Sequence, residues 1–375
     1  APTKAGLPVV AAQGGPWAVV SLHVRLGDDL TPAERRSLKP LSQALAAGEV
    51  QGRARAIGAD ASDVGGTVKA RVDADAVAVA WGVPAEHVDV ALKALDDTLR
   101  SRGKLNPTTQ AIPAWSSSDP PVDPAALALG APGTSLALPT SGGPADAPTL
   151  RALADKVLRR DRIAISVVGA QAPSDRRAVA HKALGASLPA STAPAAAGTP
   201  LVGLPDGTRL VEHDDPNATG ALSTVWLLSP GRGTTGADAR DRAARAVLAR
   251  MAGGVSEGSD ALFAVAFLVT SKRPSQIARA EAVPMRNLES VATTPPPAEA
   301  VEAARAQEKA ARLERLKDAT EIADALGRAL LAGDPSLVSK EVNAIGEVTP
   351  DDVAKAAKAL AAGPRVIVRA LGTKR

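Results

Sequence analysis

Cysteine is absent from this 375-residue chain, and so is tyrosine. Without cysteine there can be no disulfide, no thiolate zinc site and no cysteine nucleophile. The compartment stays open, because a cysteine-free chain tolerates both oxidising and reducing surroundings. Aromatic residues make up only 2% of the chain against 45% for hydrophobic residues as a whole. The core must therefore be built mainly from Ala, Val, Leu and Ile.

Long apolar runs and basic clusters interleaved with aromatics are also lacking. No run approaches the roughly 18 apolar residues that would span a bilayer. The net charge is +4, but Lys and Arg alternate with acidic residues along the chain. We therefore expect neither a membrane span nor nucleic-acid binding.

The composition indicates a source and a compartment. Heavy use of Ala, Gly, Pro and Arg is typical of GC-rich bacteria, and the chain starts at Ala1 without an initiator Met. That start suits either a mature protein after removal of a signal peptide or a trimmed chain. We expect a soluble bacterial protein that is periplasmic or envelope-associated.

An internal repeat organises the chain. Residues 150–169 and 353–372 both read as an amphipathic helix, a turn with basic residues, a β-branched strand and a glycine. Residues 74–99 and 261–290 both read as a strand, a proline-containing turn and a helix. The paired features follow the same order in both halves, so the chain is predicted to hold two copies of one domain.

The repeat predicts the domains and the fold class. Residues 189–200 are rich in Pro, Ala, Ser and Thr and read as a linker between domains 1–188 and 201–375. Each half opens with a strand followed by a helix, at 17–26 and 32–47 and again at 220–228 and 237–252. We therefore expect an α+β fold with two homologous domains, each a mostly antiparallel sheet with helices packed on one face.

Helix boundaries are marked by capping signals. Thr31, Pro32 and Glu34 form a capping-box pattern. The longest helical signal covers residues 297–331, and Thr349 is predicted to cap the last helix.

The order of these segments resembles a known family. Residues 302–372 hold a long helix, an Ala-Gly-Asp break, a short helix, a capped helix and a closing strand with Gly. Residues 21–27 and 56–99 follow the first domain of the same family. The chain thus resembles the pitrilysin, insulinase and mitochondrial processing peptidase family of inverzincin-type zinc metallopeptidases, as a degenerate bacterial member.

The resemblance implies a zinc site whose residues this chain lacks. Active members carry H-x-x-E-H on the first helix, where two His bind zinc and the Glu acts as general base. The matching positions here are Lys39, Ser42 and Gln43, which are poor ligands and bases. The four His residues (His23, His87, His181 and His213) are scattered, so no pair has ligand spacing.

Two further parts of the family's machinery are missing. No Glu occurs between Glu86 and Glu212, so the third zinc ligand is lacking, and residues 106–124 are Pro- and Ser-rich instead. In two-subunit members the non-zinc subunit supplies an Arg/Tyr pair after a glycine-rich turn. The turn survives at residues 251–254, but the chain has no Tyr. We therefore predict no catalytic, metal or cofactor site.

Other candidates have simpler interpretations. The glycine clusters at 65–66, 142–143 and 231–233 lack the Gly-Lys-Ser/Thr of a phosphate loop and read as turns. Residues 116–119 offer serines with no nearby His, so a loop is favoured over a nucleophile. Residues 213–215 could bind a cation, but a turn between strands at the following Pro216-Asn217 is favoured. Residues 159–162 favour a solvated helix end over a partner surface.

Three functions remain open. The first is a proteolytically inactive subunit that pairs with a zinc-bearing relative, as a heterodimer, to enclose peptides in a chamber. The second is a stand-alone or self-associating peptide-binding scaffold of the bacterial envelope. The third, an enzyme with an unrelated site, has no converging residues to support it.

Overall fold

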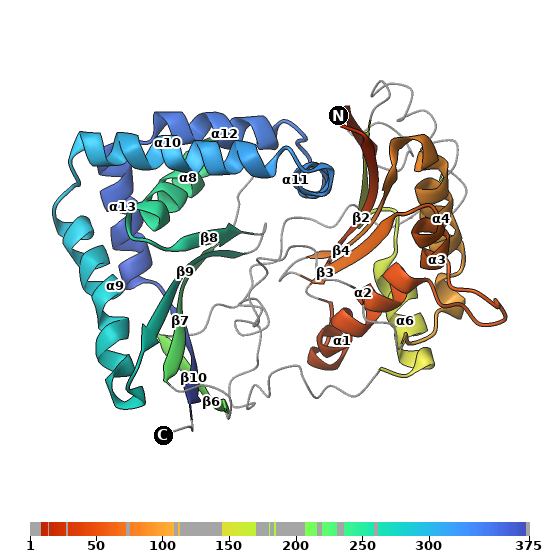
Figure 1. Cartoon of the computed structure of the whole chain (residues 1–375), viewed down its shortest axis with the longest axis horizontal. Helices are drawn as coiled ribbons and strands as arrows, with labels where there is room; N and C mark the ends of the chain where they lie inside the picture. Colours follow the sequence, from red (N-terminus) through yellow and green to blue (C-terminus); the bar gives the residue numbers. More distant parts are fainter. Residues whose placement is uncertain are drawn as a thin grey trace. The chain divides into compact units, whose positions relative to one another are not determined.

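The computed structural model describes residues 9–13, 15–27, 29–72, 76–108, 112, 145–169, 180, 184, 207–215, 220–230, 236–258 and 262–372. These residues form two compact units. The first holds the described residues up to 184 together with Arg315–Val338, and the second holds the rest. Each unit is described by itself (Figure 1).

The first unit is built on a five-stranded sheet with the order β1-β5-β2-β4-β3. Its strands are β1 (Val9–Gln13), β2 (Trp17–Arg25), β3 (Thr67–Val72), β4 (Ala76–Pro84) and β5 (Ile163–Gly169). Only β1 and β5 pair in parallel among these strands, and Leu22 of β2 lies between Val79 and Ile165. The central strand β2 thus presents Val20, Leu22 and Val24 to one face and Ser21 and His23 to the other.

Helices cover the apolar face of this sheet. They are α1 (Pro32–Arg36), α2 (Leu38–Ala47), α3 (Gly58–Asp63), α4 (Val88–Arg100) and α6 (Ala147–Val157), with short 3₁₀ turns at Ala85–His87 and Arg102–Lys104. Helices α2 and α4 pack on the strands, and α6 contacts α2 on the same side (Figure 1). The core between them is aliphatic, and Trp81 is the one aromatic side chain among its described members.

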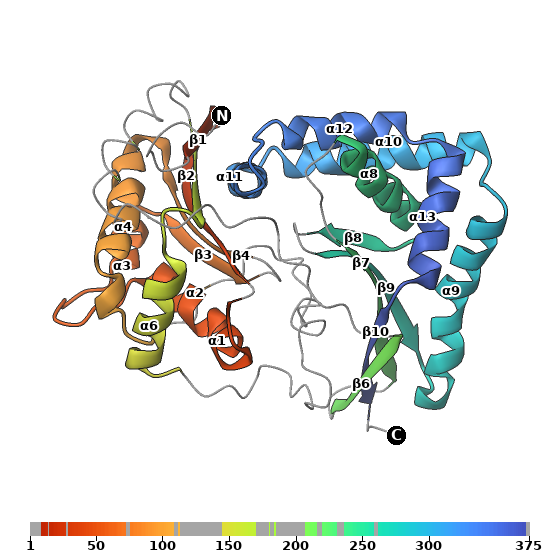
Figure 2. The same cartoon turned by 180° about the vertical axis from the view of Figure 1, so that it is seen from behind.

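A helix from far along the sequence covers the other face. Helix α11 (Ala319–Leu331) packs on β2 and β5 and belongs to the first unit (Figure 2). The buried apolar residues there are few and mostly small: Val19, Ala78, Ala80, Val168 and Ala323. Ala319, Ile322 and Leu326 of α11 are partly buried against them. Because this face of β2 also carries Ser21 and His23, the contact with α11 combines apolar and polar groups.

The second unit repeats the plan with the strand order β6-β10-β7-β9-β8. Its strands are β6 (Thr208–Asp215), β7 (Ala221–Pro230), β8 (Val255–Gly258), β9 (Leu262–Ser271) and β10 (Arg365–Gly372). Its helices are α8 (Gly236–Met251), α9 (Ile277–Thr293), α10 (Ala298–Arg315), α12 (Leu337–Glu347) and α13 (Pro350–Ala362), with a 3₁₀ turn at Pro274–Gln276. As in the first unit, the outer strand β6 runs parallel to its neighbour β10. The identical orders agree with the internal duplication read from the sequence.

The α+β fold class is confirmed, and so are the capping box at Thr31 and the N-cap at Thr349, which also forms a capping box with Asp352. The single helix expected over 297–331 is wrong: α10 ends at Arg315, and Asp318 caps α11 by accepting from the amides of Thr320 and Glu321. The helix expected over 32–47 is likewise divided at Ser37.

The domain ranges 1–188 and 201–375 stay a prediction, as does the linker 189–200, which lies outside the described residues. One segment of the later range, Arg315–Val338, packs with the first unit. As a result, the first sheet has a helix on its second face as well as helices on its first.

We expect that any side chain at position 327 of α11, in place of Gly327, will destabilise the chain. A methyl group there would lie 2.1 Å from Cδ2 of His23, whose ring is buried and bonded to Ser21. We expect Gly327→Ala to lower the free energy of unfolding by about 1–3 kcal/mol, because overpacking outweighs the better helix propensity of Ala. Urea unfolding of the whole chain measures the change.

Gly346→Ala is the matched control. Gly346 is an exposed glycine of α12, with no atom within 4 Å of an added Cβ. Here Ala should stabilise by about 0.5–1 kcal/mol. Equal stabilisation by both substitutions would contradict the close packing of α11 on His23.

Candidate functional site

The positions that match the zinc motif lie together on α2. Lys39, Ser42 and Gln43 are three and four residues apart and so share one side of the helix. Lys39 is exposed, whereas Ser42 is 2% exposed and donates its hydroxyl hydrogen to the carbonyl of Lys39 at 2.8 Å. The helix therefore presents an ammonium, an internally bonded hydroxyl and an amide where an active member presents two imidazoles and a carboxylate.

The remaining ligand candidates do not gather around α2. Across the part of the chain that the structure describes, no three His, Cys, Asp or Glu side chains are grouped to hold a metal ion. His87 is exposed on a 3₁₀ turn, and His181 lies outside the described residues. The predicted absence of a catalytic, metal or cofactor site remains a prediction.

The other sequence candidates have varied outcomes. Gly65 has a positive φ of 77° and turns the chain between α3 and β3. Residues 142–143, 231–233 and 116–119 lie outside the described ranges. Residues 213–215 are the end of β6, and the turn expected after them at Pro216-Asn217 lies outside the described residues. Residues 109–111 and 113–124 of the Pro/Ser-rich stretch are likewise not described.

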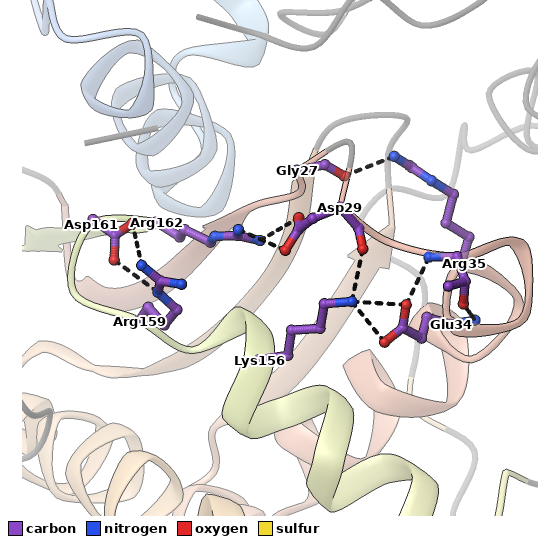
Figure 3. A network of polar contacts seen from close by, with 9 residues as sticks. Gly27, Asp29, Glu34, Arg35, Lys156, Arg159, Asp161 and Arg162 are labelled. Carbon is purple, nitrogen blue, oxygen red and sulfur yellow. Dashed lines mark hydrogen bonds and ion pairs between the residues drawn. The ribbon is translucent and has the colours of Figure 1, made fainter. Parts of the chain in front are cut away.

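The basic cluster at 159–162 is partly buried rather than a solvated helix end. Arg162 is 9% exposed and bonds both carboxylate oxygens of Asp29 at 3.0 and 2.9 Å (Figure 3). Lys156 of α6 bonds Glu34 of α1 and the carbonyl of Asp29. These bonds from Arg162 and Lys156 lower the pKa of Asp29 and of Glu34 respectively. The network fastens the loop before α1 to the turn before β5, which is a structural role.

A second polar network lies between the first sheet and α11. Ser166 of β5 donates to the carbonyl of Ala323 at 2.7 Å, and its oxygen lies 2.6 Å from that of Ser21. Ser21 in turn lies 2.9 Å from Nε2 of His23. The side chains of Ser21, His23 and Ser166 are all fully buried.

The direction of this chain of hydrogen bonds follows from counting hydrogens. A hydroxyl has one hydrogen to donate. Because Ser166 gives its hydrogen to Ala323, Ser21 must donate to Ser166. Ser21 has then no hydrogen left for His23, so Nε2 of His23 carries the proton and donates to Ser21.

Asp324 of α11 completes the network. Its carboxylate bonds Arg71 of β3 at 2.5 Å and Arg328 of α11 at 3.0 Å, and lies 3.9 Å from Nδ1 of His23. Burial alone would raise the pKa of Asp324, but the positive charges of Arg328 and Arg71 outweigh it and hold the pKa far below its usual range. Asp324 is therefore ionised at every physiological pH.

Ser21, His23 and Asp324 are the residue types of a hydrolytic triad, but the geometry excludes that role. A triad needs an imidazole nitrogen that accepts the serine hydrogen. Here Nε2 donates to Ser21, and no side chain of the group reaches solvent. The network therefore serves to hold α11 on the sheet.

The second unit has an ion pair of its own in its helix-covered face. Arg369 of β10 bonds both carboxylate oxygens of Glu281 of α9 at 2.7 Å, and also Glu212 of β6. Burial would raise the pKa of Glu281, but its bonds to Arg369 lower it. This pair anchors α9 to the sheet, and it too is structural.

Two units with the same five-stranded order define the class of fold, which is that of the M16-type peptidases. No protein-family model and no curated protein matches the chain. A crystal structure of a peptidase M16 inactive domain from Pseudomonas fluorescens matches with a TM-score of 0.66 and 16% identity, over 98% of this chain and 96% of that one.

Two further solved structures share the fold. A protease from Helicobacter pylori has a TM-score of 0.69 and 12% identity, with 97% of each chain covered. A chain of Complex III2 from Candida albicans, with Inz-5 bound, has a TM-score of 0.67 and 13% identity, over 96% and 93% of the two chains. At such identities the likeness shows the fold, and the pitrilysin-type fold predicted from the sequence is confirmed.

The Asp324 network predicts that removing the charge of Asp324 will strongly lower the stability of the chain. We expect Asp324→Asn to lower the free energy of unfolding by about 3 kcal/mol at pH 7, because it leaves Arg71 without its buried counter-ion. Since the folded pKa of Asp324 is depressed, its contribution is complete above the unfolded pKa of about 3.9 and declines as pH falls below it. Urea unfolding at pH 7, 5 and 3.5 follows the difference between the two proteins.

Asp63→Asn is the matched control. Asp63 pairs with Arg55, but both side chains are more than half exposed. An exposed pair of this kind contributes about 0–1 kcal/mol. Similar losses for the two substitutions would show that the Asp324 network does not hold α11.

Proposed function

We propose that the chain is a proteolytically inactive, processing-peptidase-like subunit that pairs with a zinc-bearing relative to enclose peptides. The observation that carries the proposal is the retained two-unit peptidase fold with Lys39, Ser42 and Gln43 at the motif positions of α2. A chain of this kind contributes a wall and an interface to a chamber, and the zinc chemistry comes from the partner.

The structural comparisons support this proposal in general terms. One similar structure is of an inactive peptidase domain, and another belongs to a multi-subunit complex. The fold is thus used without peptidase activity in at least one protein and within an assembly in another. None of the helices in the described ranges has the length and apolarity that crossing a membrane requires. The envelope or periplasmic location stays a prediction.

Association is the first property to test. We expect size-exclusion chromatography with light scattering to show a defined heterodimer when the chain is mixed with a zinc-bearing relative from its own source. The complex should cleave peptides, and mutation of the relative's motif Glu should abolish cleavage without abolishing the complex. If the chain stays separate from every such relative, the subunit proposal is wrong.

Zinc content tests the interpretation of α2. The chain as it stands should bind no stoichiometric zinc, because a Lys ammonium offers no lone pair. Lys39→His/Gln43→His places two imidazoles at i and i+4 on one helix face and should create measurable zinc binding. Lys39→His alone is the control and should bind far less. Equal zinc in all three proteins would show that α2 does not mark the family's zinc position.

The runner-up is a stand-alone peptide-binding scaffold, and the edge strand β3 favours it. β3 lies at the end of the first sheet's strand order, and extended peptides can add to such an edge through backbone groups alone. A peptide array should then give binders to the isolated chain. Because neighbouring amides of a strand point in opposite directions, only one of Val68→Pro and Lys69→Pro should remove binding without disturbing the β3–β4 pairing. An array without binders would rule this function out.

A further inference from the structure

Helix α11 reaches the first unit by an unusual route. The chain leaves the second unit after Glu314, contributes Arg315–Val338 to the first unit, and returns to the second unit at Ser339. The packing of α11 on the first sheet therefore ties a segment of the later sequence to the earlier domain.

The surface beneath α11 differs from an ordinary core. On the opposite face of the same sheet, large aliphatic side chains such as Leu22 and Ile165 pack among many others. Beneath α11 the buried apolar residues of the sheet are Ala and Val, and Ile322 and Leu326 of α11 are only partly buried against them, so this face offers less apolar area than the opposite one. Polar groups supply the specific contacts instead.

Three features of α11 meet matching features of the sheet. The carbonyl of Ala323 accepts from Ser166, the carboxylate of Asp324 pairs with Arg71, and the bare Cα of Gly327 lies against His23. The two polar contacts have substitutes in water, because carbonyl, carboxylate, guanidinium and hydroxyl groups are all well hydrated.

Helix α11 also carries what it needs to stay helical without the sheet. Its N-terminus is capped within the segment by Asp318, and Asp324 keeps its partner Arg328 four residues on. Gly333, with a φ of 87°, follows the C-terminus of the helix within the same segment. The strands β2, β4 and β5 likewise keep their mutual pairing without α11.

We propose that α11 is a detachable latch, which leaves the first sheet while the rest of that unit stays folded. Its release exposes a polar strip of Ser21, His23, Ser166 and Arg71. It also frees the segment Arg315–Val338, which in the sequence lies between two stretches of the second unit. The latch opens by local unfolding at a free energy below that of the whole unit. This holds whether or not the chain is a peptidase subunit.

The absence of cysteine makes the latch directly measurable. Ala323 is a fully buried residue of α11, and Ala91 is a fully buried residue of α4 on the opposite face of the same sheet. A single thiol from Ala323→Cys should react with a maleimide at least about tenfold faster than one from Ala91→Cys, since only the former needs α11 alone to open. Adding Arg71→Ala should raise the rate at position 323 by a further factor of about ten and leave position 91 unchanged.

Amide hydrogen exchange on the unmodified chain gives the same comparison without a new side chain in the core. Peptides from α11 should exchange faster than peptides from α4, and Arg71→Ala should accelerate α11 selectively. If α11 and α4 exchange together and the two thiols react at the same rate, α11 opens only when the unit unfolds, and the latch is disproved.

Discussion

The hydrogen bond from Ser166 to the carbonyl of Ala323 is the constraint that fixes the position of α11 on the first sheet. It uses the only hydrogen of Ser166, and so fixes Ser21 as a donor and His23 as the source of the proton at Nε2. The hydrogen bonds of this buried network can be satisfied in one direction only. They therefore define a single position for α11 on the sheet. The ion pair between Asp324 and Arg71 then stabilises α11 in the position that these hydrogen bonds define.

The two sheets differ on the face that receives α11 in the first unit. On this face β2 presents Val19, Ser21 and His23. The strand β7 has the same place in the second sheet, and on the face opposite its helix-covered core it presents Leu222, Thr224 and Trp226. The small polar surface that receives α11 is therefore replaced in the second unit by a bulkier, more apolar one. The two domains therefore differ on the sheet face that does not contribute side chains to the helix-covered core.

The repeat, the fold class and the two helix caps were readable from the sequence because each depends on local or periodic signals. The position of α11 was not. The alternation in β2 marks Ser21 and His23 as polar, and polar strand residues ordinarily face water. The Ala/Leu periodicity continues through Leu316, and no Gly or Pro marks the break before α11. Asp318 was the available signal, as a capping residue within the pattern. The zinc positions came from the family resemblance and not from any local signal.

The structure also explains how the motif positions could lose zinc chemistry without loss of the fold. Helix α2 is held by Leu38, Leu41 and Leu45, which are buried against the sheet. Lys39 and Gln43 lie outside that buried set, and the hydroxyl of Ser42 is satisfied within its own helix. The side chains that would make a peptidase are thus separate from those that make the helix pack. The burial energy of α2 therefore depends little on Lys39 and Gln43, whereas Ser42 is buried and belongs to the packed side of the helix.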